Sequence, residues 1–424
     1  KHYSMNTKYI HIGKSTILWE KASFSRVFKF LKNNSLSRAE LSDGNGNVKN
    51  IHYGDILIKF SECLYTDEGN NIPYIINDNI AYKLLKLSPL INGDIVFADA
   101  AEDNTVGKCI EIITHNNTDL VAGLHTIPCR PTIKFAEGFL GYYLNSTTYH
   151  NQLLQYIQGT KISSISKKSI CQTIISYPSE IINQQKIASY FQSLDSLIQS
   201  TSKKLASLKQ IKAASLQSMF PQEGETVPKV RFKGFEGEWE KEKLSKLLVE
   251  RHEISTITDK LPQLSFTISE GIIYPDDRKS NKRDFLIKDI VNKKYLTTYV
   301  GDIIYNPANV IYGAIHRNSL CNGVVSPIYK IFSTEQDSNF MECIVRNPTF
   351  ISQLSMKTEG TVTKLKTLKP ESFLEMIVKI APSINEQQKI TSYFCNLDKQ
   401  ISLQAQRLEK LKQIKSACLD KMFV

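Results

Sequence analysis

Two short segments of the sequence contain residue types that could bind phosphate or metal, but neither has the complete spacing. GKST, at Gly13–Thr16, matches the end of a phosphate-binding loop, yet Lys8 stands where G-x-x-x-x-G-K-[ST] needs its first glycine. Without that glycine the backbone cannot cradle a phosphate. PDDRK, at 275–279, has residues found in metal-dependent nucleases, but they are adjacent in the chain. A solvated loop is the simpler interpretation.

Other catalytic patterns are incomplete or missing. NPAN, at 306–309, resembles the N-P-P-[YFW] loop of amino-methyltransferases, but Ala308 replaces the second proline and no G-x-G-x-x-G loop accompanies it. Neither H-E-x-x-H nor G-x-S-x-G occurs. The eight cysteines form no C-x-x-C pair, which predicts neither a disulfide framework nor a zinc site. We therefore expect no catalytic residue, no metal and no cofactor in this chain.

Glycine-led basic turns are better candidates for binding, because they recur at matching places. QGTKISSISKKSI contains Gly159, and EGTVTKLKTLKPESF contains Gly360. Exposed amides, a hydroxyl and lysines at one turn suit phosphate contacts, although a solvated turn before a strand is the alternative. PDDRKSNKRDF adds a basic loop, where arginine could read guanine and lysine would more often meet phosphate. The candidate DNA-contacting residues are Thr160, Lys161, Lys167, Lys168, Arg278, Lys279, Lys282, Arg283, Thr361, Lys364 and Lys366.

Composition is consistent with a basic globular protein. The 424 residues carry a net charge of +11 and a pI near 9.0, which fits attraction to nucleic acid without establishing it. This length allows about two to four domains. No apolar run approaches the ~18 residues of a membrane span, and the first residues lack a signal-peptide core. We expect a cytoplasmic protein that does not bind a membrane.

An internal repeat organises the chain. Residues 184–220 align without a gap on residues 387–423, and 20 of these 37 positions are identical. WEKASFSRVF from Trp19 is likewise echoed by WEKEKLSKLL from Trp239, and the chain has only these two tryptophans. The period is too long for a solenoid, whose units run to about 20–50 residues. The pattern indicates duplication of a two-part module.

Both copies of the repeat carry an apolar stripe with steps of three and four residues, which predicts two long amphipathic helices. Pro178 and Pro382 stand just upstream of them. Each stripe can be buried against the other in an antiparallel coiled coil, because each helix must return from one intervening domain to the other. Lysines between the stripe positions, such as Lys212 and Lys415, are expected on the solvated face. The predicted seam and partner-binding residues are Ile187, Phe191, Leu194, Ile198, Leu205, Leu208, Ile390, Phe394, Leu397, Ile401, Leu408 and Leu411.

The segments between the helices have the pattern of compact α+β domains. HYGDILIKF, NGDIVFADA and VGDIIYNPA each combine a Gly-Asp turn with a β-rich run. The predicted fold class is α+β, with two pseudo-symmetric domains separated by two long antiparallel coiled-coil helices. The predicted parts are a first domain with its N-terminal segment, a central helix, a linker with the second domain, and a distal helix, at 1–178, 179–221, 222–382 and 383–424.

This arrangement resembles the specificity subunit of type I restriction-modification systems. The resemblance lies in PSEIINQQKIASYF…LKQIKAASLQSMFP, PSINEQQKITSYF…LKQIKSACLDKMF and VPKVRFKGFEGEWEKEKL, although the residues before Trp19 do not match the last phrase. It implies a non-catalytic chain with two target-recognition domains, each reading one half of a bipartite site in double-stranded DNA. The helices would set the spacer and dock two methyltransferase subunits, which carry S-adenosylmethionine. Restriction and translocation subunits would complete the assembly.

One alternative from another class of protein is a duplicated coiled-coil scaffold that binds proteins rather than DNA. Salt distinguishes the two, because DNA affinity that depends on several phosphate contacts falls steeply with salt concentration. The DNA sequence itself cannot be predicted, since base readout depends on loop geometry.

Overall fold

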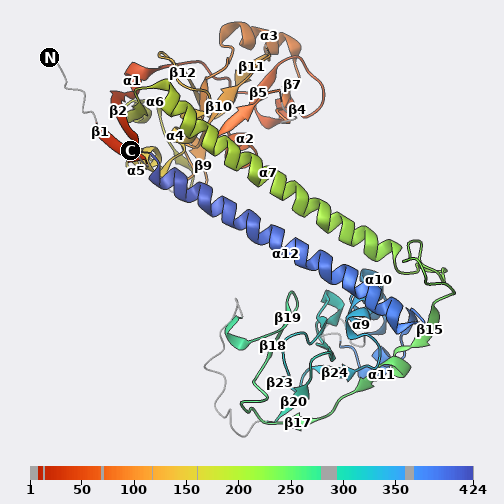
Figure 1. Ribbon diagram of the computed structural model, residues 1–424. Coiled ribbons are helices and arrows are strands. Elements are labelled where there is room, and N and C mark those ends of the chain that lie inside the picture. Colours follow the sequence, from red (N-terminus) through yellow and green to blue (C-terminus); the bar gives the residue numbers. More distant parts are fainter. Residues whose placement is uncertain are drawn as a thin grey trace. The chain divides into compact units, whose positions relative to one another are not determined.

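The computed structural model describes residues 8–12, 15–67, 71–116, 118–159, 161–277, 294–358 and 367–423 (Figure 1). The chain forms two compact units. Unit 1 consists of Lys1–Lys203 with Ala405–Val424, and unit 2 consists of Lys204–Gln404. Each long helix therefore contributes one segment to each unit. The four-part division expected from the sequence stays a prediction.

Two helices of 38 residues, α7 (Ile181–Ser218) and α12 (Ile384–Lys421), contain the repeated sequence (Figure 1). In unit 1 the start of α7 packs beside the end of α12, and in unit 2 the end of α7 packs beside the start of α12. The two helices are therefore antiparallel. None of the expected seam residues is exposed: seven are buried (Ile187, Phe191, Leu194, Leu208, Ile390, Phe394, Leu397) and five are half-buried (Ile198, Leu205, Ile401, Leu408, Leu411).

Unit 1 is built on a five-stranded sheet with smaller sheets beside it. The sheet has the order β3 (Phe28–Phe30), β12 (Thr126–Pro131), β8 (Ile95–Ala98), β10 (Cys109–Ile113), β6 (Cys63–Tyr65). A three-stranded sheet has the order β1 (Lys8–Ile12), β2 (Ser15–Ser23), β14 (Ile174–Pro178). A four-stranded sheet has the order β11 (Leu120–Ala122), β5 (Lys49–Ile51), β7 (Tyr74–Ile75), β4 (Leu41–Ser42), and β13 (Ser163–Ser164) pairs with β9 (Ala100–Ala101).

Short helices connect these strands of unit 1. They are α1 (Phe24–Val27), η1 (Arg38–Glu40), α2 (Tyr53–Ile58), α3 (Asp78–Leu87), α4 (Phe139–Leu144), α5 (Thr147–Leu154) and α6 (Lys167–Ile170). Aromatic side chains of α4 join the core of this unit to α7, since the Tyr142 ring stacks on Phe191 at 4.8 Å. The core of the domain and the helix seam are therefore continuous within unit 1.

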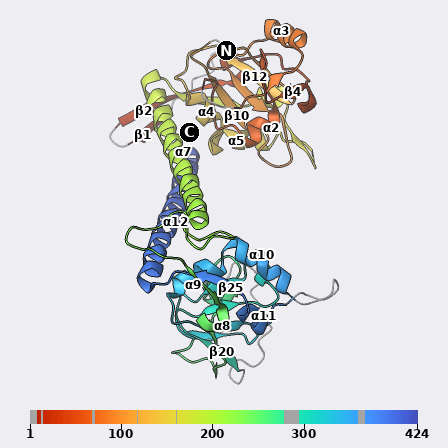
Figure 2. The same ribbon diagram turned by 90° about the vertical axis from the view of Figure 1, so that its right-hand side faces the viewer.

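Unit 2 repeats this plan, with fewer strands among its described residues. Its main sheet has the order β16 (Val249–Glu250), β24 (Lys330–Ser333), β21 (Ile303–Tyr305), β22 (Ile315–Arg317). A second sheet has the order β17 (Ile254–Ser255), β20 (Tyr295–Thr298), β23 (Gly323–Val325), while β15 (Glu240–Lys243) pairs with β25 (Ile377–Ile380) and β18 (Ser265–Thr267) with β19 (Gly271–Ile273). The helices are α8 (Leu244–Leu247), η2 (Pro275–Asp277), η4 (Val310–Tyr312), α9 (Ser338–Val345), α10 (Pro348–Lys357) and α11 (Pro370–Leu374), and α9, α10 and α11 lie around β25 (Figure 2).

The two tryptophans mark equivalent places in the units. Trp19 precedes the turn of α1 and is fully buried 6.5 Å from the Phe139 ring, while Trp239 precedes the turn of α8 and is buried 5.5 Å from the Phe340 ring. In register, Glu20 pairs with Tyr177 on β14 just as Glu240 pairs with Ile380 on β25. The fold therefore confirms two pseudo-symmetric α+β domains with a long antiparallel helix pair.

One expected β-rich run is a helix. HYGDILIKF forms α2, because the His52 side chain accepts a hydrogen bond from the Gly54 N–H and so caps the first turn. Asp55, in that turn, forms ion pairs with Arg38 at 2.6 Å and Lys59 at 3.1 Å. These side-chain contacts outweigh the β-rich composition of the run. The other two Gly-Asp turns do precede strands, β8 and β21.

Candidate nucleic-acid interface

The first glycine-led turn is a closed loop whose tip is exposed. Gln158 and Ser164 exchange backbone hydrogen bonds of 3.1 and 2.8 Å across it. Gly159 has φ 107°, and an added Cβ would lie 1.9 Å from the Ile162 carbonyl oxygen, so only glycine fits. Lys161 is exposed at the tip, and Ile162 is 61% exposed. This geometry presents a cation and an apolar side chain to solvent.

The lysines that follow the turn lie on α6. Ser166 caps this short helix by accepting a hydrogen bond from the Ser169 N–H at 3.1 Å. Lys167 and Lys168 are both exposed, and the Lys167 ammonium lies 5.6 Å from the centre of the Phe30 ring. The structure therefore places three predicted candidates, Lys161 included, on one short exposed segment. The others, Thr160, Arg278, Lys279, Lys282, Arg283, Thr361, Lys364 and Lys366, lie outside the described residues.

In both units the segment after the glycine-led turn is fastened to the end of the central strand. In unit 1 the Ile165 N–H donates to the carbonyl oxygen of Asp99, just after β8, at 3.0 Å. In unit 2 the Leu368 N–H donates to the carbonyl oxygen of Pro307, just after β21, at 3.1 Å. This equivalent contact shows that each domain brings the same two segments together.

A hollow of about 550 Å³ lies beside the end of β8 in unit 1. Asp99 and His125 line it, with 3.2 Å between the carboxylate and imidazole nitrogen. Burial raises the pKa of Asp99, and the nearby His125 opposes that shift. His125 has φ 53°, the left-handed region that is costly for a side chain larger than glycine. Polar residues of the segment 33–35 complete this side of the hollow.

A hollow of about 440 Å³ lies at the corresponding strand end in unit 2. It is lined by the carboxamides Asn306 and Asn309, which belong to the NPAN segment, and by an aromatic pair, Phe266 and Tyr329, whose rings lie 5.3 Å apart. Sequence analysis assigned no role to NPAN. The tertiary structure, in contrast, places it next to the segment that follows the second glycine-led turn.

The Gly-Asp turns anchor the starts of the same two strands by ion pairs of buried carboxylates, which the sequence patterns did not reveal. Asp94 is fully buried and accepts two 2.7 Å hydrogen bonds from the Arg130 guanidinium. Asp302 is 3% exposed and accepts bonds of 3.0 and 3.1 Å from Arg251. Such bidentate pairs fix geometry because the guanidinium and carboxylate are both planar. Each central strand is thereby anchored at the end opposite to its hollow.

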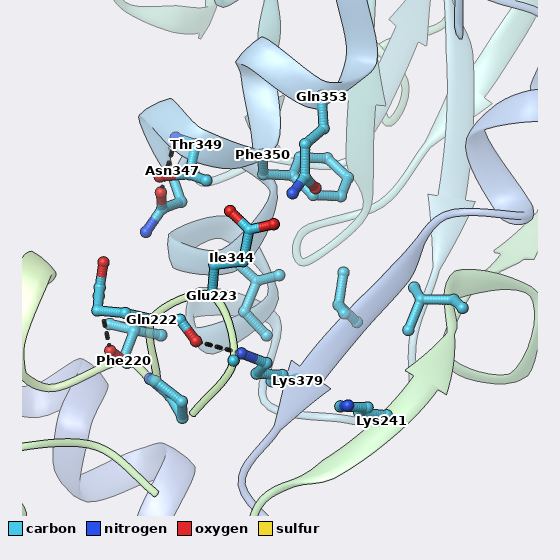
Figure 3. Close-up of a pocket in the computed structure, with 14 residues that line it drawn as sticks. Phe220, Gln222, Glu223, Lys241, Ile344, Asn347, Thr349, Phe350, Gln353 and Lys379 are labelled. Atoms are coloured by element: carbon cyan, nitrogen blue, oxygen red, sulfur yellow. Dashed lines mark hydrogen bonds between the residues drawn. The ribbon is translucent and has the colours of Figure 1, made fainter. Parts of the chain in front are cut away.

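Another hollow of unit 2, about 400 Å³, lies away from the strand end (Figure 3). Phe220, Ile344 and Phe350 line it, and Lys379 donates a hydrogen bond to the Gln222 carbonyl oxygen. Gln353 points into it as well (Figure 3). The glycine-led segment does not line this hollow, so we do not count it as part of the candidate interface.

The duplicated helix phrase makes the same contacts in both units. Asp195 of α7 pairs with Lys415 of α12 at 2.6 Å, and Asp398 of α12 pairs with Lys212 of α7 at 2.5 Å. Equivalent ring contacts are Phe191 with Phe423 at 5.8 Å in unit 1, and Phe394 with Phe220 at 6.2 Å in unit 2. The prediction that Lys415 lies on the solvated face of the helix is therefore wrong, because its side chain is only 14% exposed.

The first glutamine of the phrase fastens each helix to its domain. Gln184 accepts from the Ala136 N–H at 3.0 Å and donates to the Pro178 carbonyl oxygen at 2.8 Å. Gln387 accepts from the Asp337 N–H at 3.1 Å and donates to the Ala381 carbonyl oxygen at 2.9 Å. Both glutamines are buried. In each unit, the same hydrogen bonds of the repeated phrase therefore attach the domain to the start of its helix.

Comparisons with known proteins agree with this architecture. Residues 18–210 match the family model of the type I restriction modification DNA specificity domain. The S subunit of a type I restriction-modification system from M. genitalium is 12% identical, with 98% of each chain covered and a TM-score of 0.57. The HsdS subunit from Thermoanaerobacter tengcongensis is 15% identical, with 96% of each chain covered and a TM-score of 0.45. A chain from a structure on complex assembly and conformational transition of the type I R-M system is 14% identical, covering 95% of this chain and 97% of that one, with a TM-score of 0.48. No curated protein matches the sequence.

The duplicated domains and the helix pair are the architecture that this chain shares with the M. genitalium S subunit. Residues 18–210 thus match the type I restriction modification DNA specificity domain, and the chain as a whole has the fold of a specificity (S) subunit. Among the helices of the described residues, none is long and apolar enough to cross a membrane. Within the same residues, no group of His, Cys, Asp and Glu side chains could hold a metal ion.

Proposed function

We propose that each unit reads one half of a bipartite, asymmetric DNA site, and that the helix pair sets the spacer and docks two methyltransferase subunits. The observation that carries this proposal is the equivalent contact between the glycine-led segment and the central strand end in both units. The two units present similar surfaces, and the same helix contacts recur in both. Such an arrangement suits binding to two sites on one duplex. The residues that follow the two central strands differ, Asp99 after β8 and Asn306 with Asn309 after β21, so the two half-sites would differ.

The rest of the assembly follows from that assignment. S-adenosylmethionine would be bound by the methyltransferase subunits, and restriction and translocation subunits would add cleavage. The complex would act in the cytoplasm, where its DNA substrate is. The competing function is a protein-binding scaffold, for which the exposed lysines of the glycine-led segment would be ordinary solvated residues.

The decisive experiment maps methylated sites in cells that contain this chain and a methyltransferase partner. We expect one motif with two unlike halves and a constant spacer. Replacing residues 20–177 by the equivalent domain of a relative should exchange one half and leave the other unchanged. Four residues inserted between Thr201 and Leu205 should add ~6 Å of helix, at about 1.5 Å per residue, and lengthen the spacer. Methylation that does not depend on this chain would refute the proposal.

Removing the charge of one exposed lysine distinguishes the DNA-binding function from the protein-binding scaffold. Lys161→Ala should weaken binding of the complex about equally to target and random duplex, and should reduce the slope of log affinity against log salt by roughly one unit. Lys203→Ala, on the exposed face of α7, is the matched control and should leave the slope unchanged. An unchanged slope for Lys161→Ala would assign Lys161 to the solvated surface.

A further inference from the structure

Asn309 occupies a position where the asparagine side chain usually caps a helix, yet its side chain does not do so. It is the residue before η4, and its carboxamide makes no capping hydrogen bond. Asn77 and Asn347 also precede helices, and both accept a backbone N–H, from Ile80 at 3.2 Å and Thr349 at 2.9 Å. A cap of this kind normally stabilises a helix start. The Asn309 carboxamide is half-buried in the unit 2 hollow and has no hydrogen-bond partner among the described residues.

The backbone around Asn309 is fixed without help from its side chain. The Asn306 N–H donates to the Ala314 carbonyl oxygen at 2.9 Å, and the Ala314 and Tyr312 N–H groups both donate to the Asn309 carbonyl oxygen at 3.3 and 3.0 Å. Gly313 has φ 85°, which closes the turn in a conformation that favours glycine. The loop therefore fixes the backbone of Asn309, so only the torsions of its side chain have to be ordered on binding.

Asn306 adds a second polar group to the same wall. Its Oδ1 accepts a hydrogen bond from the Ala308 N–H at 3.1 Å, which fixes the side chain. Its amide nitrogen has no partner within the described part of the chain. Two neighbouring carboxamides thus offer donors and an acceptor to whatever enters the hollow. Both residues are half-buried, so their free polar atoms are open to a ligand that enters the hollow.

The chemistry of the hollow favours a base over a phosphate. No lysine or arginine lines it among the described residues, whereas phosphate contacts depend on cations. A carboxamide matches adenine, because it can accept from N6 and donate to N7 at once. Apolar side chains in the same wall, Ile268 at 46% exposure and Phe266, suit contact with the methyl group of the paired thymine.

We propose that Asn309, supported by Asn306, reads an A·T pair in the half-site recognised by unit 2, with the carboxamide on the adenine. This inference rests on the proposed function and assigns a specificity-determining residue within it. Lysines of the glycine-led segment would place the duplex through its phosphates, and Asn309 would select one base pair. The unit 1 hollow also contains two asparagines, but both amides already have partners: Asn33 donates to the Gly123 carbonyl oxygen and Asn34 to the Ala122 carbonyl oxygen.

The test uses the complex of this chain with its methyltransferase partner and duplexes that carry the mapped motif. Each position of the motif is replaced in turn by the other three base pairs, and affinity is measured by competition. Asn309→Ala should lose about 5- to 150-fold discrimination at one A·T position of one half-site, and leave every other position unchanged. Asn309→Asp, which can only accept when ionised, should weaken adenine at that position and favour a base pair that presents a donor alone.

Gln353→Ala is the matched control, because this residue is also a half-buried carboxamide in a hollow of unit 2 (Figure 3). It should leave the motif unchanged. A uniform loss of affinity for Asn309→Ala at all positions would make Asn309 a backbone contact and overturn the inference. So would an unaltered motif in Asn309→Ala with wild-type affinity. If the wild-type complex shows no sequence preference, the proposed function fails, and the assignment of Asn309 fails with it.

Discussion

The contact between the helix pair and the domain, called the joint below, differs between the two units, although the repeated helix residues are the same. In unit 1 Lys415 pairs with Asp195 and also with Glu62, both at 2.6 Å, and lies 5.6 Å from the centre of the Tyr142 ring. In unit 2 the equivalent Lys212 pairs, among the described residues, with Asp398 alone, and these side chains are 33% and 54% exposed. The domains supply the difference, since Glu62 precedes β6 and Tyr142 lies on α4.

The pKa values show that the added partners of Lys415 matter. Burial lowers the pKa of Lys415, but the carboxylates of Glu62 and Asp195 outweigh that effect and raise it overall. On the unit 2 side, Lys212 and Asp398 lie near Cys343, and burial raises the pKa of this thiol to about 12. An identical helix phrase can therefore form a desolvated charge network in one unit and an exposed ion pair in the other.

The largest expected effect comes from breaking the unit 1 network. Lys415→Ala leaves two carboxylates close together and partly buried, and should lower the free energy of unfolding of unit 1 by about 3 kcal/mol. Lys212→Ala should cost less than about 1 kcal/mol in unit 2, because the pair is exposed.

Urea unfolding can follow each unit by its one tryptophan. In a Trp239→Phe background, fluorescence reports on Trp19 in unit 1, and in a Trp19→Phe background it reports on Trp239 in unit 2. Equal losses for the two lysine variants would contradict the distinction between the joints.

The second prediction concerns pH, to which the units should respond in opposite directions. Glu111 accepts from the Gly138 and Gly141 N–H groups at 2.8 and 2.7 Å, and burial nevertheless raises its pKa to about 7. The contribution of Glu111 to the free energy of unfolding is fully present below its ordinary pKa of about 4.5, and it is lost as the pH rises to about 7. The change in unit 1 should be on the order of 2–3 kcal/mol.

Glu342 provides the opposite case in unit 2. Burial would raise its pKa, but the adjacent His316 imidazole, a 3.2 Å hydrogen bond from the Arg317 N–H and the charge of Arg346 lower the pKa overall. Its contribution is present above its ordinary pKa and is lost as pH falls through the lowered value. Glu111→Gln should flatten the decline of unit 1 between about pH 4.5 and 7 in the same fluorescence assay. A decline that persists in this variant would assign the effect to another group.

The smallest expected effect isolates one hydrogen bond of the unit 1 joint. The Tyr142 hydroxyl donates to Asp195 at 2.8 Å, and its ring stacks on Phe191. Tyr142→Phe keeps the ring and should cost about 1 kcal/mol. Tyr190→Phe is a suitable control, since its hydroxyl is near only the Cys418 sulfur at 3.6 Å on an exposed face. A loss comparable to that of Lys415→Ala would mean that Tyr142, rather than Lys415, holds the network together.

Features that depend on local spacing were predictable from the sequence. The duplication, the two long helices and their antiparallel packing follow from an apolar stripe that must be buried wherever the helix lies. The closed turn at Gly159 was also visible, because a glycine before a hydroxyl and lysines is a local pattern. HYGDILIKF was misassigned to a strand, since its β-rich composition does not show the His52 cap or the ion pairs of Asp55, one of which is with Arg38 outside the run.

Contacts between distant residues were decided only by the tertiary structure. Glu62 meets Lys415 across 353 residues, and no periodic pattern encodes such a pair. The same holds for the hollow at Asn309. NPAN is not a complete motif, and only the tertiary structure brings the end of β21 against the segment around Leu368. By itself the sequence determined two repeated helices and two domains. Folding decided which lysine is buried and which asparagine remains free, because burial and hydrogen bonding depend on neighbours that the chain brings together from far apart.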